Sequence, residues 1–99
     1  DMSQPENPGQ GGRRVVITGA SRGIGEAIAH ELAGRSSWIC LVGRDRKALE
    51  AVRASLASVT MVDCSVIAGD LLDAGTRDQI VSAASARGGL DLLVNNAGI

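Results

Sequence analysis

A glycine-rich stretch near the N-terminus limits what this chain can fold into more than any other segment. It runs from Thr18 to Gly25, follows the β-branched run Val15-Val16-Ile17, and leads into a segment with helical spacing. A strand, a glycine turn and a helix in that order direct backbone N–H groups and the positive end of the helix at one point, which suits a phosphate. The glycines allow a tight turn, the approach of a pyrophosphate and close packing of helix on strand. The Gly-x-x-x-Gly-x-Gly spacing therefore predicts a phosphate-binding turn, although it differs from the common Gly-x-Gly-x-x-Gly fingerprint.

Four apolar segments alternate with three segments of helical periodicity along the chain. The first two apolar segments have continuous apolar runs, which is typical of strands covered on both faces of a parallel sheet, whereas Asp63 and Ser65 interrupt the third. The four segments are Arg13–Thr18, Trp38–Gly43, Met61–Ala68 and Leu90–Asn95. The order βαβαβαβ predicts an α/β fold with a Rossmann-type, doubly wound parallel sheet. Right-handed crossovers give the strand order 3-2-1-4, with the first two helices on one face and the third on the other.

Each predicted helix carries a row of apolar residues that we expect to face the sheet. Gly34 and the Ser36-Ser37 pair are expected to end the first helix. Asp45 and Asp73 are expected to cap the second and third helices, the third running from Ala74 to Ala86. The expected rows are Ile24, Ile28 and Leu32 in the first helix, Leu49, Val52, Leu56 and Val59 in the second, and Ile80, Val81 and Ala84 in the third.

Composition and charge argue against several kinds of partner. The 99 residues carry a net charge of −1 and a single aromatic side chain, so neither nucleic acid nor an anionic membrane is indicated. No apolar run approaches the roughly 20 residues that span a bilayer, and the N-terminus lacks a secretory apolar region. Cys40 and Cys64 are expected to be buried thiols and form no metal-ligand cluster. These features predict a cytoplasmic protein, with residues 1–12 as a mobile tail.

Polar or glycine-rich clusters follow all four predicted strands. Beside the glycine stretch they are Gly43-Arg44, Gly69-Asp70-Leu71 and Asn95-Asn96-Ala97-Gly98. In an open parallel sheet, ligands bind outside the carboxyl ends of the strands, near the point where the strand order reverses. The four clusters therefore predict one ligand site at this edge, between the first and fourth strands.

Arg44 is the most informative single residue at this edge. It lies 19 residues after Gly25, about where a fold that selects NAD places an acidic residue on the ribose 2′-hydroxyl. A guanidinium there grips a 2′-phosphate through charge-assisted hydrogen bonds, and Arg22 in the glycine stretch adds a second positive charge. The sequence therefore predicts NADP as the cofactor. The alternative interpretation is a solvated arginine, which we prefer for Arg46.

The polar residues after the third and fourth strands each have two interpretations. Asp70 is either a turn residue or the acceptor for the adenine amino group. Asn95 and Asn96 are either ordinary turn formers or residues that tie neighbouring strand ends together and shape the floor of the groove. Their position at strand ends favours the second interpretation in each case.

With these residues in place, the chain resembles the N-terminal part of a short-chain dehydrogenase/reductase. The resemblance covers about Arg14 to Ile99 and is carried by four motifs in order. They are Thr-Gly-x-x-x-Gly-x-Gly at Thr18 to Gly25, the NADP-type strand end Gly43-Arg44, Asp70-Leu71, and Asn-Asn-Ala-Gly at Asn95 to Gly98. It implies that residues 13–99 form the N-terminal half of a dinucleotide-binding domain, truncated after the fourth strand. The implied NADP-binding residues are Gly19, Ser21, Arg22, Gly23, Ile24, Gly25, Arg44, Asp70, Leu71, Asn96, Ala97 and Gly98.

The same resemblance implies an oxidoreductase that transfers hydride between nicotinamide and a carbonyl or alcohol substrate. The family's Ser and Tyr-x-x-x-Lys relay has no counterpart here, because the chain has no tyrosine and its only lysine is Lys47 in the second helix. We therefore assign no catalytic residue and expect this stretch alone to be inactive. The full-length protein could form a homo-oligomer, and the sequence does not decide this.

Two further expectations follow from the apparent truncation. The fourth strand, with Leu92, Leu93 and Val94, is expected to be an open apolar edge that makes the isolated chain unstable or self-associating. The missing relay also leaves a non-catalytic NADP-binding regulatory module as the alternative function. A methyltransferase-like domain is disfavoured, because that class needs an acidic residue where Arg44 stands.

Overall fold

The computed structural model describes residues 12–21 and 23–96. The expected tail, apart from Gly12, lies outside these ranges, as do the predicted site residues Arg22, Ala97 and Gly98 together with Ile99. No helix in the described ranges is long and apolar enough to cross a bilayer.

Strands and helices alternate through the described chain, as the sequence predicts. In order, the elements are β1 (Arg13–Thr18), α2 (Gly23–Ala33), β2 (Ser36–Gly43), α3 (Arg46–Ala57), β3 (Asp63–Ala68), α4 (Ala74–Ala86) and β4 (Leu92–Asn95). The strands form one sheet in the order β3-β2-β1-β4, and every pair is parallel. The predicted strand order 3-2-1-4 is confirmed.

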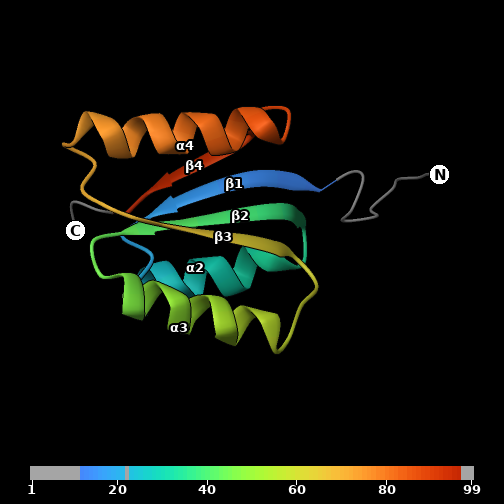
Figure 1. Ribbon diagram of the computed structural model, residues 1–99. Coiled ribbons are helices and arrows are strands. Elements are labelled where there is room, and N and C mark those ends of the chain that lie inside the picture. Colours follow the sequence, from blue (N-terminus) through green and yellow to red (C-terminus); the bar gives the residue numbers. More distant parts are fainter. Residues whose placement is uncertain (1–11, 22, 97–99) are drawn as a thin grey trace.

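Helices cover both faces of this sheet, so the doubly wound arrangement is confirmed. Figure 1 shows α2 and α3 below the sheet and α4 above it. Alternate strand residues pack into the two cores, because successive side chains of a strand point to opposite faces. The α2–α3 side buries Val15, Ile17, Ile39 and Leu41, and the α4 side buries Val16, Trp38, Cys40 and Val42.

The faces that α2 and α4 bury differ from the expected rows. In α2 the buried row is Gly25, Ala29 and Ala33, while Ile24 is 59% exposed. Small residues on this row let the helix axis approach the sheet closely, so the larger side chains one position away are left at the flank. The prediction that Ile24 faces the core is therefore wrong.

In α4 and after α3, one residue of each expected row lies outside the core, while the others face the sheet as predicted. The α4 row that faces the sheet is Thr76, Ile80 and Ala84, at intervals of four residues. Val81 is one residue off this row and is 63% exposed. Val59 lies beyond the end of α3 and is 69% exposed, so both assignments to the core are wrong. The remaining α3 row, Leu49, Val52 and Leu56, is buried as predicted.

The predicted helix caps are confirmed, whereas three strand boundaries shift. The carboxylates of Asp45 and Asp73 accept hydrogen bonds from the third residues of their helices. β2 begins two residues earlier than predicted, at Ser36, whose hydroxyl donates to the Leu32 carbonyl at 2.7 Å. β3 and β4 each begin two residues later, at Asp63 and Leu92.

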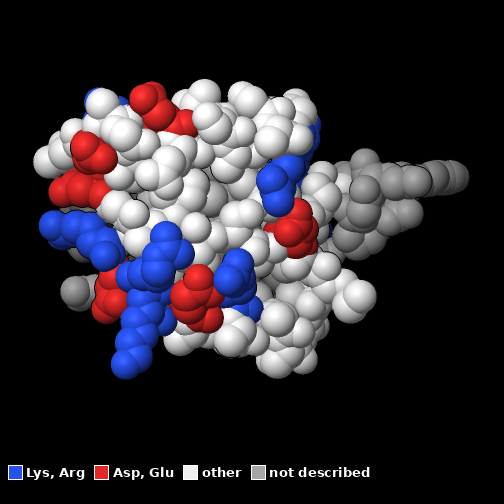
Figure 2. Space-filling view, viewed as in Figure 1, with Lys and Arg blue, Asp and Glu red and all other residues white. Residues whose placement is uncertain are grey.

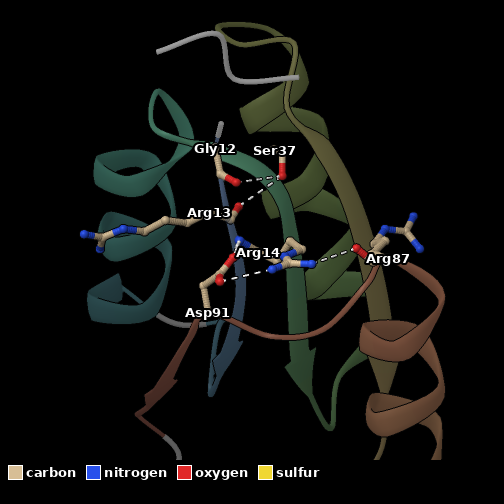
Figure 3. Close-up of polar contacts among 6 residues, drawn as sticks. All are labelled: Gly12, Arg13, Arg14, Ser37, Arg87 and Asp91. Carbon is tan, nitrogen blue, oxygen red and sulfur yellow. Dashed lines mark hydrogen bonds and ion pairs between the residues drawn. The ribbon is translucent and has the colours of Figure 1, made fainter. Parts of the chain in front are cut away.

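An arginine–aspartate clamp at the amino end of the sheet explains the late start of β4 (Figure 3). The Asp91 carboxylate accepts from the backbone N–H of Arg14 and from its Nε, both at 2.9 Å. The Asp91 N–H donates to the Arg14 carbonyl at 2.9 Å, and Arg14 Nη1 donates to the Arg87 carbonyl at 3.1 Å. The clamp thus joins β1, the end of α4 and the approach to β4. These hydrogen bonds lower the pKa of Asp91 and raise that of Arg14.

A second polar cluster packs beside this clamp, on the α4 side of the sheet. The Arg87 guanidinium lies 4.7 Å from the centre of the Trp38 ring and pairs with Asp63 at 2.8 Å. The indole N–H of Trp38 donates to the Ser65 hydroxyl at 2.9 Å. The only aromatic residue is therefore a structural anchor for β2, β3 and α4, at the end of the sheet remote from the predicted ligand edge.

Both cysteines are free thiols within the sheet. Burial raises the pKa of Cys40 to about 12 and that of Cys64 to about 11. They stand on adjacent strands, but Cys64 is paired with Ile39 and Cys40 with Ser65. The two side chains therefore belong to opposite faces of the sheet. Cys40 is buried as predicted, whereas Cys64 is half-buried.

Candidate functional site

A groove of about 960 Å³ lies at the carboxyl ends of the strands, where the four clusters predict a site. Its walls come from the glycine stretch, the end of β2, the start of α3, the loop after β3 and the residue after β4. The lining residues are Thr18, Gly19, Ser21, Gly23, Ile24, Val42, Gly43, Arg44, Asp45, Ala48, Gly69, Asp70, Leu71, Leu72 and Asn96. This volume is in the range of a small-molecule or cofactor site.

The glycine turn needs its glycines at two positions for different reasons. Gly19 has a backbone φ of 64°, a left-handed conformation that favours glycine. A Cβ on Gly25 would lie only 2.4 Å from the Gly19 carbonyl oxygen and 2.8 Å from Ala20 Cα. Because both neighbours are backbone atoms, only glycine lets α2 approach the turn this closely. The start of α2, at Gly23, therefore opens into the groove with its N-terminal end.

A hydrogen-bonded cluster ties the end of β1 to the end of β4 beneath the groove. The buried hydroxyl of Thr18 contacts the Val94 carbonyl at 3.3 Å and Asn95 Oδ1 at 3.1 Å. It accepts from the Asn96 N–H at 3.1 Å, and the Asn96 side-chain amide donates to the Gly19 carbonyl at 3.2 Å. The two asparagines therefore connect neighbouring strand ends, which is the second of the two interpretations given above.

Arg44 follows the end of β2 on the groove wall and is exposed. Among residues 12–21 and 23–96 its guanidinium makes no hydrogen bond or ion pair. Arg46, two residues on, pairs with Glu50 at 3.6 Å. Figure 2 shows basic side chains gathered on the left, over the start of α3 and the carboxyl ends of the strands. Of these two arginines, only Arg44 both lines the groove and has its donors available for an anion.

The loop after β3 forms the opposite wall and is rigidly built. Gly69 continues the β3–β2 ladder, donating to the Gly43 carbonyl at 2.8 Å. The Asp70 carboxylate accepts from the Leu72 N–H through Oδ1 at 2.9 Å, so the turn role of Asp70 is shown. Within the described ranges its second oxygen has no protein partner, so an acceptor at the groove is retained. Leu71 is half-buried and Leu72 is 87% exposed on the wall.

The structure brings most of the sequence-predicted site residues together. Eight of the twelve line the groove: Gly19, Ser21, Gly23, Ile24, Arg44, Asp70, Leu71 and Asn96. Gly25 lies directly behind them, under the Gly19 carbonyl. Arg22, Ala97 and Gly98 fall outside the described residues.

Sequence reasoning missed several groove residues. Asp45, Ala48 and Leu72 also line it, because the first turn of α3 and the loop before α4 fold back toward the strand ends. Asp45 and Ala48 follow Arg44 closely at the start of a predicted helix. That spacing was the sequence signal that could have identified them as groove residues. No group of three or more His, Cys, Asp or Glu side chains suited to a metal ion occurs in the described part of the chain.

Together, the parallel sheet, the glycine turn and the groove at the strand ends define a Rossmann-type nucleotide-binding domain. The chain belongs to the short-chain dehydrogenase family, whose sequence profile matches residues 13–99. It is 38% identical over 98 residues to glucose 1-dehydrogenase of Gluconobacter oxydans, covering 98% of this chain and 37% of the relative. It is 40% identical over 89 residues to 11-beta-hydroxysteroid dehydrogenase A of Sesamum indicum, covering 89% and 26%.

Solved structures agree with this assignment. L-sorbose reductase of Gluconobacter frateurii, in complex with NADPH and L-sorbose, superposes with a TM-score of 0.81 at 38% identity, over 94% of this chain and 36% of that one. A metagenomic short-chain oxidoreductase in complex with NADP gives a TM-score of 0.75 at 35% identity, over 87% and 39%. The chain thus spans little more than a third of the length of these relatives at most.

Proposed function

We propose that this chain is the NADP(H)-binding portion of a short-chain oxidoreductase that transfers hydride between nicotinamide and a small carbonyl or alcohol substrate. The observation that carries the proposal is the Arg44 guanidinium, which has no partner among residues 12–21 and 23–96, on the wall of a groove that begins at a glycine turn. The relatives solved with NADPH and NADP support the same cofactor. We place the protein in the cytoplasm.

The predicted site residues divide into three groups by what they offer a dinucleotide. Gly19, Ser21, Gly23 and Ile24, with Gly25 behind them, hold the pyrophosphate at the start of α2, where backbone N–H groups and the helix dipole favour an anion. Arg44, with Arg22, holds the 2′-phosphate of the adenosine ribose. Asp70 and Leu71 flank the adenine, and Asn96, Ala97 and Gly98 lead toward the nicotinamide ribose.

This assignment requires backbone that is open to a phosphate at the turn. Gly19 lines the groove in a left-handed conformation and carries no side chain that would cover the backbone there. When bound, the nicotinamide supplies or accepts the hydride. This chain's residues bind and orient the cofactor, and the proton relay lies outside these 99 residues, which contain no tyrosine. On this proposal the 99 residues alone are inactive. A purely NADP-binding regulatory module is the alternative, and it predicts binding without turnover in every longer form of the protein.

The substitution Arg44→Asp tests the assignment of the 2′-phosphate. We expect NADPH binding to weaken by about 1.5–3 kcal/mol, or roughly 10–150-fold, on the scale of a charge-assisted hydrogen bond. NADH affinity should stay level or improve, because an acidic residue at this position suits the ribose 2′-hydroxyl. Isothermal titration calorimetry with each cofactor measures both.

Arg46→Asp is the matched control, because it changes the same charge two residues away at a side chain paired with Glu50. We expect it to weaken NADPH binding less than about threefold, since a screened surface charge acts only weakly at a distance. Equal losses of NADPH and NADH affinity in Arg44→Asp would contradict the assignment. So would an Arg46→Asp variant that loses as much NADPH affinity as Arg44→Asp.

A further inference from the structure

The first residues of α4 contain a side chain that reaches back over the groove loop. Arg77 lies one position beyond the buried Thr76 and is itself exposed. Its Nη1 donates to the Leu71 carbonyl at 2.7 Å, the short distance expected of a charge-assisted hydrogen bond. Arg77 does not line the groove. It therefore contacts the groove wall from behind, through the backbone of Leu71.

The other hydrogen bonds of this loop involve Asp70, Leu72, Asp73 and Thr76. Asp73 caps α4 and accepts from the N–H and hydroxyl of Thr76, both at 3.1 Å. The Asp73 N–H donates to the Asp70 carbonyl at 2.9 Å, and the Asp70 carboxylate accepts from the Leu72 N–H. None of these bonds engages the Leu71 carbonyl. Arg77 supplies the hydrogen bond to the carbonyl of the peptide between Leu71 and Leu72.

That peptide connects directly to the acceptor on the groove wall. The Leu72 N–H belongs to it and donates to Asp70 Oδ1. Rotation of the peptide would break this bond and release the Asp70 carboxylate from its orientation. The loop is also crowded at its start, because a Cβ on Gly69 would lie 2.2 Å from Thr76 Oγ1. Arg77 binds the carbonyl of the same Leu71–Leu72 peptide that donates to Asp70.

We propose that Arg77 is a positioning residue for the adenine end of the groove: by holding the Leu71 carbonyl, it orients the Asp70 carboxylate toward the adenine amino group. The inference rests on the proposed function, since it assumes that the groove holds an adenine dinucleotide. It adds a residue that neither lines the groove nor belongs to any of the four strand-end clusters.

Reduced nicotinamide hypoxanthine dinucleotide phosphate is the probe that isolates this contact. It keeps both phosphates and the 2′-phosphate of NADPH but has an oxygen in place of the adenine amino group. We expect the wild-type protein to bind NADPH about tenfold more tightly than this analogue, the scale of one charge-assisted hydrogen bond. Arg77→Met, which keeps most of the side-chain bulk, should reduce that preference below about threefold.

Two further variants make the test specific. Arg77→Lys retains the charge and a donor, and should keep the preference above about fivefold. Arg53→Met is the matched control, because Arg53 also donates to a backbone carbonyl, that of Cys64 at 3.4 Å, away from the groove. It should keep the full preference. If Arg77→Met fails to fold, Arg77→Gln, too short to reach the Leu71 carbonyl, takes its place with the same expected loss.

The outcomes separate this inference from the proposed function. An unchanged preference for NADPH over the analogue in Arg77→Met would overturn the positioning role. Equal wild-type affinity for the two compounds would also overturn it, since no amino-group contact would then exist to be positioned. Neither result alters the Arg44 comparison of NADPH with NADH. Equal losses of NADPH and NADH affinity in Arg44→Asp would count against the proposed function itself.

Discussion

The close contact between α2 and the glycine turn makes Gly25→Ala a quantitative test of the fold. The new Cβ would meet the Gly19 carbonyl oxygen at 2.4 Å and Ala20 Cα at 2.8 Å, whereas ordinary Cβ contacts lie at 3.4–4 Å. Since both neighbours are backbone, α2 must retreat from the turn by about 1 Å. A gap of that size reduces the dispersion energy of each contact along the helix by about a quarter to a half.

The magnitude follows from two opposing effects. Overpacking of this kind costs about 1–3 kcal/mol, and rigid backbone neighbours argue for the upper end. Replacement of a helical glycine by alanine stabilises the helix by about 1 kcal/mol. We therefore expect the free energy of unfolding to fall by about 2 kcal/mol in Gly25→Ala. The retreat also strains the bond from the Asn96 amide to Gly19, so NADPH affinity should fall in parallel.

Equilibrium unfolding in urea measures this loss, with Gly34→Ala as the matched control. A Cβ on Gly34, just after the end of α2, meets nothing within 4 Å. This variant should be as stable as the wild type or more stable by up to about 1 kcal/mol. If Gly25→Ala matched Gly34→Ala in stability, the steric account of the turn would be refuted.

Two further predictions concern the polar ties at the ends of the sheet. Thr18→Val should lower the free energy of unfolding by about 1–3 kcal/mol, because the half-buried N–H of Asn96 loses its acceptor; a loss under about 0.5 kcal/mol in urea unfolding would contradict this contact. Asp91→Asn should destabilise the protein at neutral pH, because Arg14 holds the pKa of Asp91 below its ordinary value of 3.8. A carboxyl group whose pKa is lower in the folded state stabilises the folded protein at pH values above its unfolded-state pKa. This stabilisation is lost as the pH falls through the folded-state pKa. The stability gap between wild type and Asp91→Asn should therefore shrink as the pH drops below about 4, and a gap that is constant from pH 7 to pH 2 would rule out the ionic contribution.

The strand order and the position of the site were predictable because they rest on topology and not on side-chain detail. Apolar strands that alternate with helices, together with right-handed crossovers, leave few arrangements, and the observed order is among them. Once the strands are parallel, their carboxyl ends share one edge. Arg44, Asp70 and Asn96 then meet at one groove whatever the packing beneath them.

Features that depend on helix rotation and on long-range pairing were not predictable. Ile24 fits an apolar row by spacing, but the helix turns its small residues to the sheet because Gly25 must lie against the turn. The partner of Arg14 is Asp91, 77 residues away, and nothing local in the sequence specifies that pair. The contact of Arg77 with Leu71 was not predictable for the same reason, since it depends on the path of the loop before α4.

A crystal structure of the protein with NADP+ tests the central claim most directly, through the distance from the Arg44 guanidinium to the 2′-phosphate. We predict at least one nitrogen–oxygen distance of about 2.7–2.9 Å, with the pyrophosphate at the start of α2. A 2′-phosphate directed into solvent, with Arg44 left unpaired, would contradict the claim that this groove selects NADP.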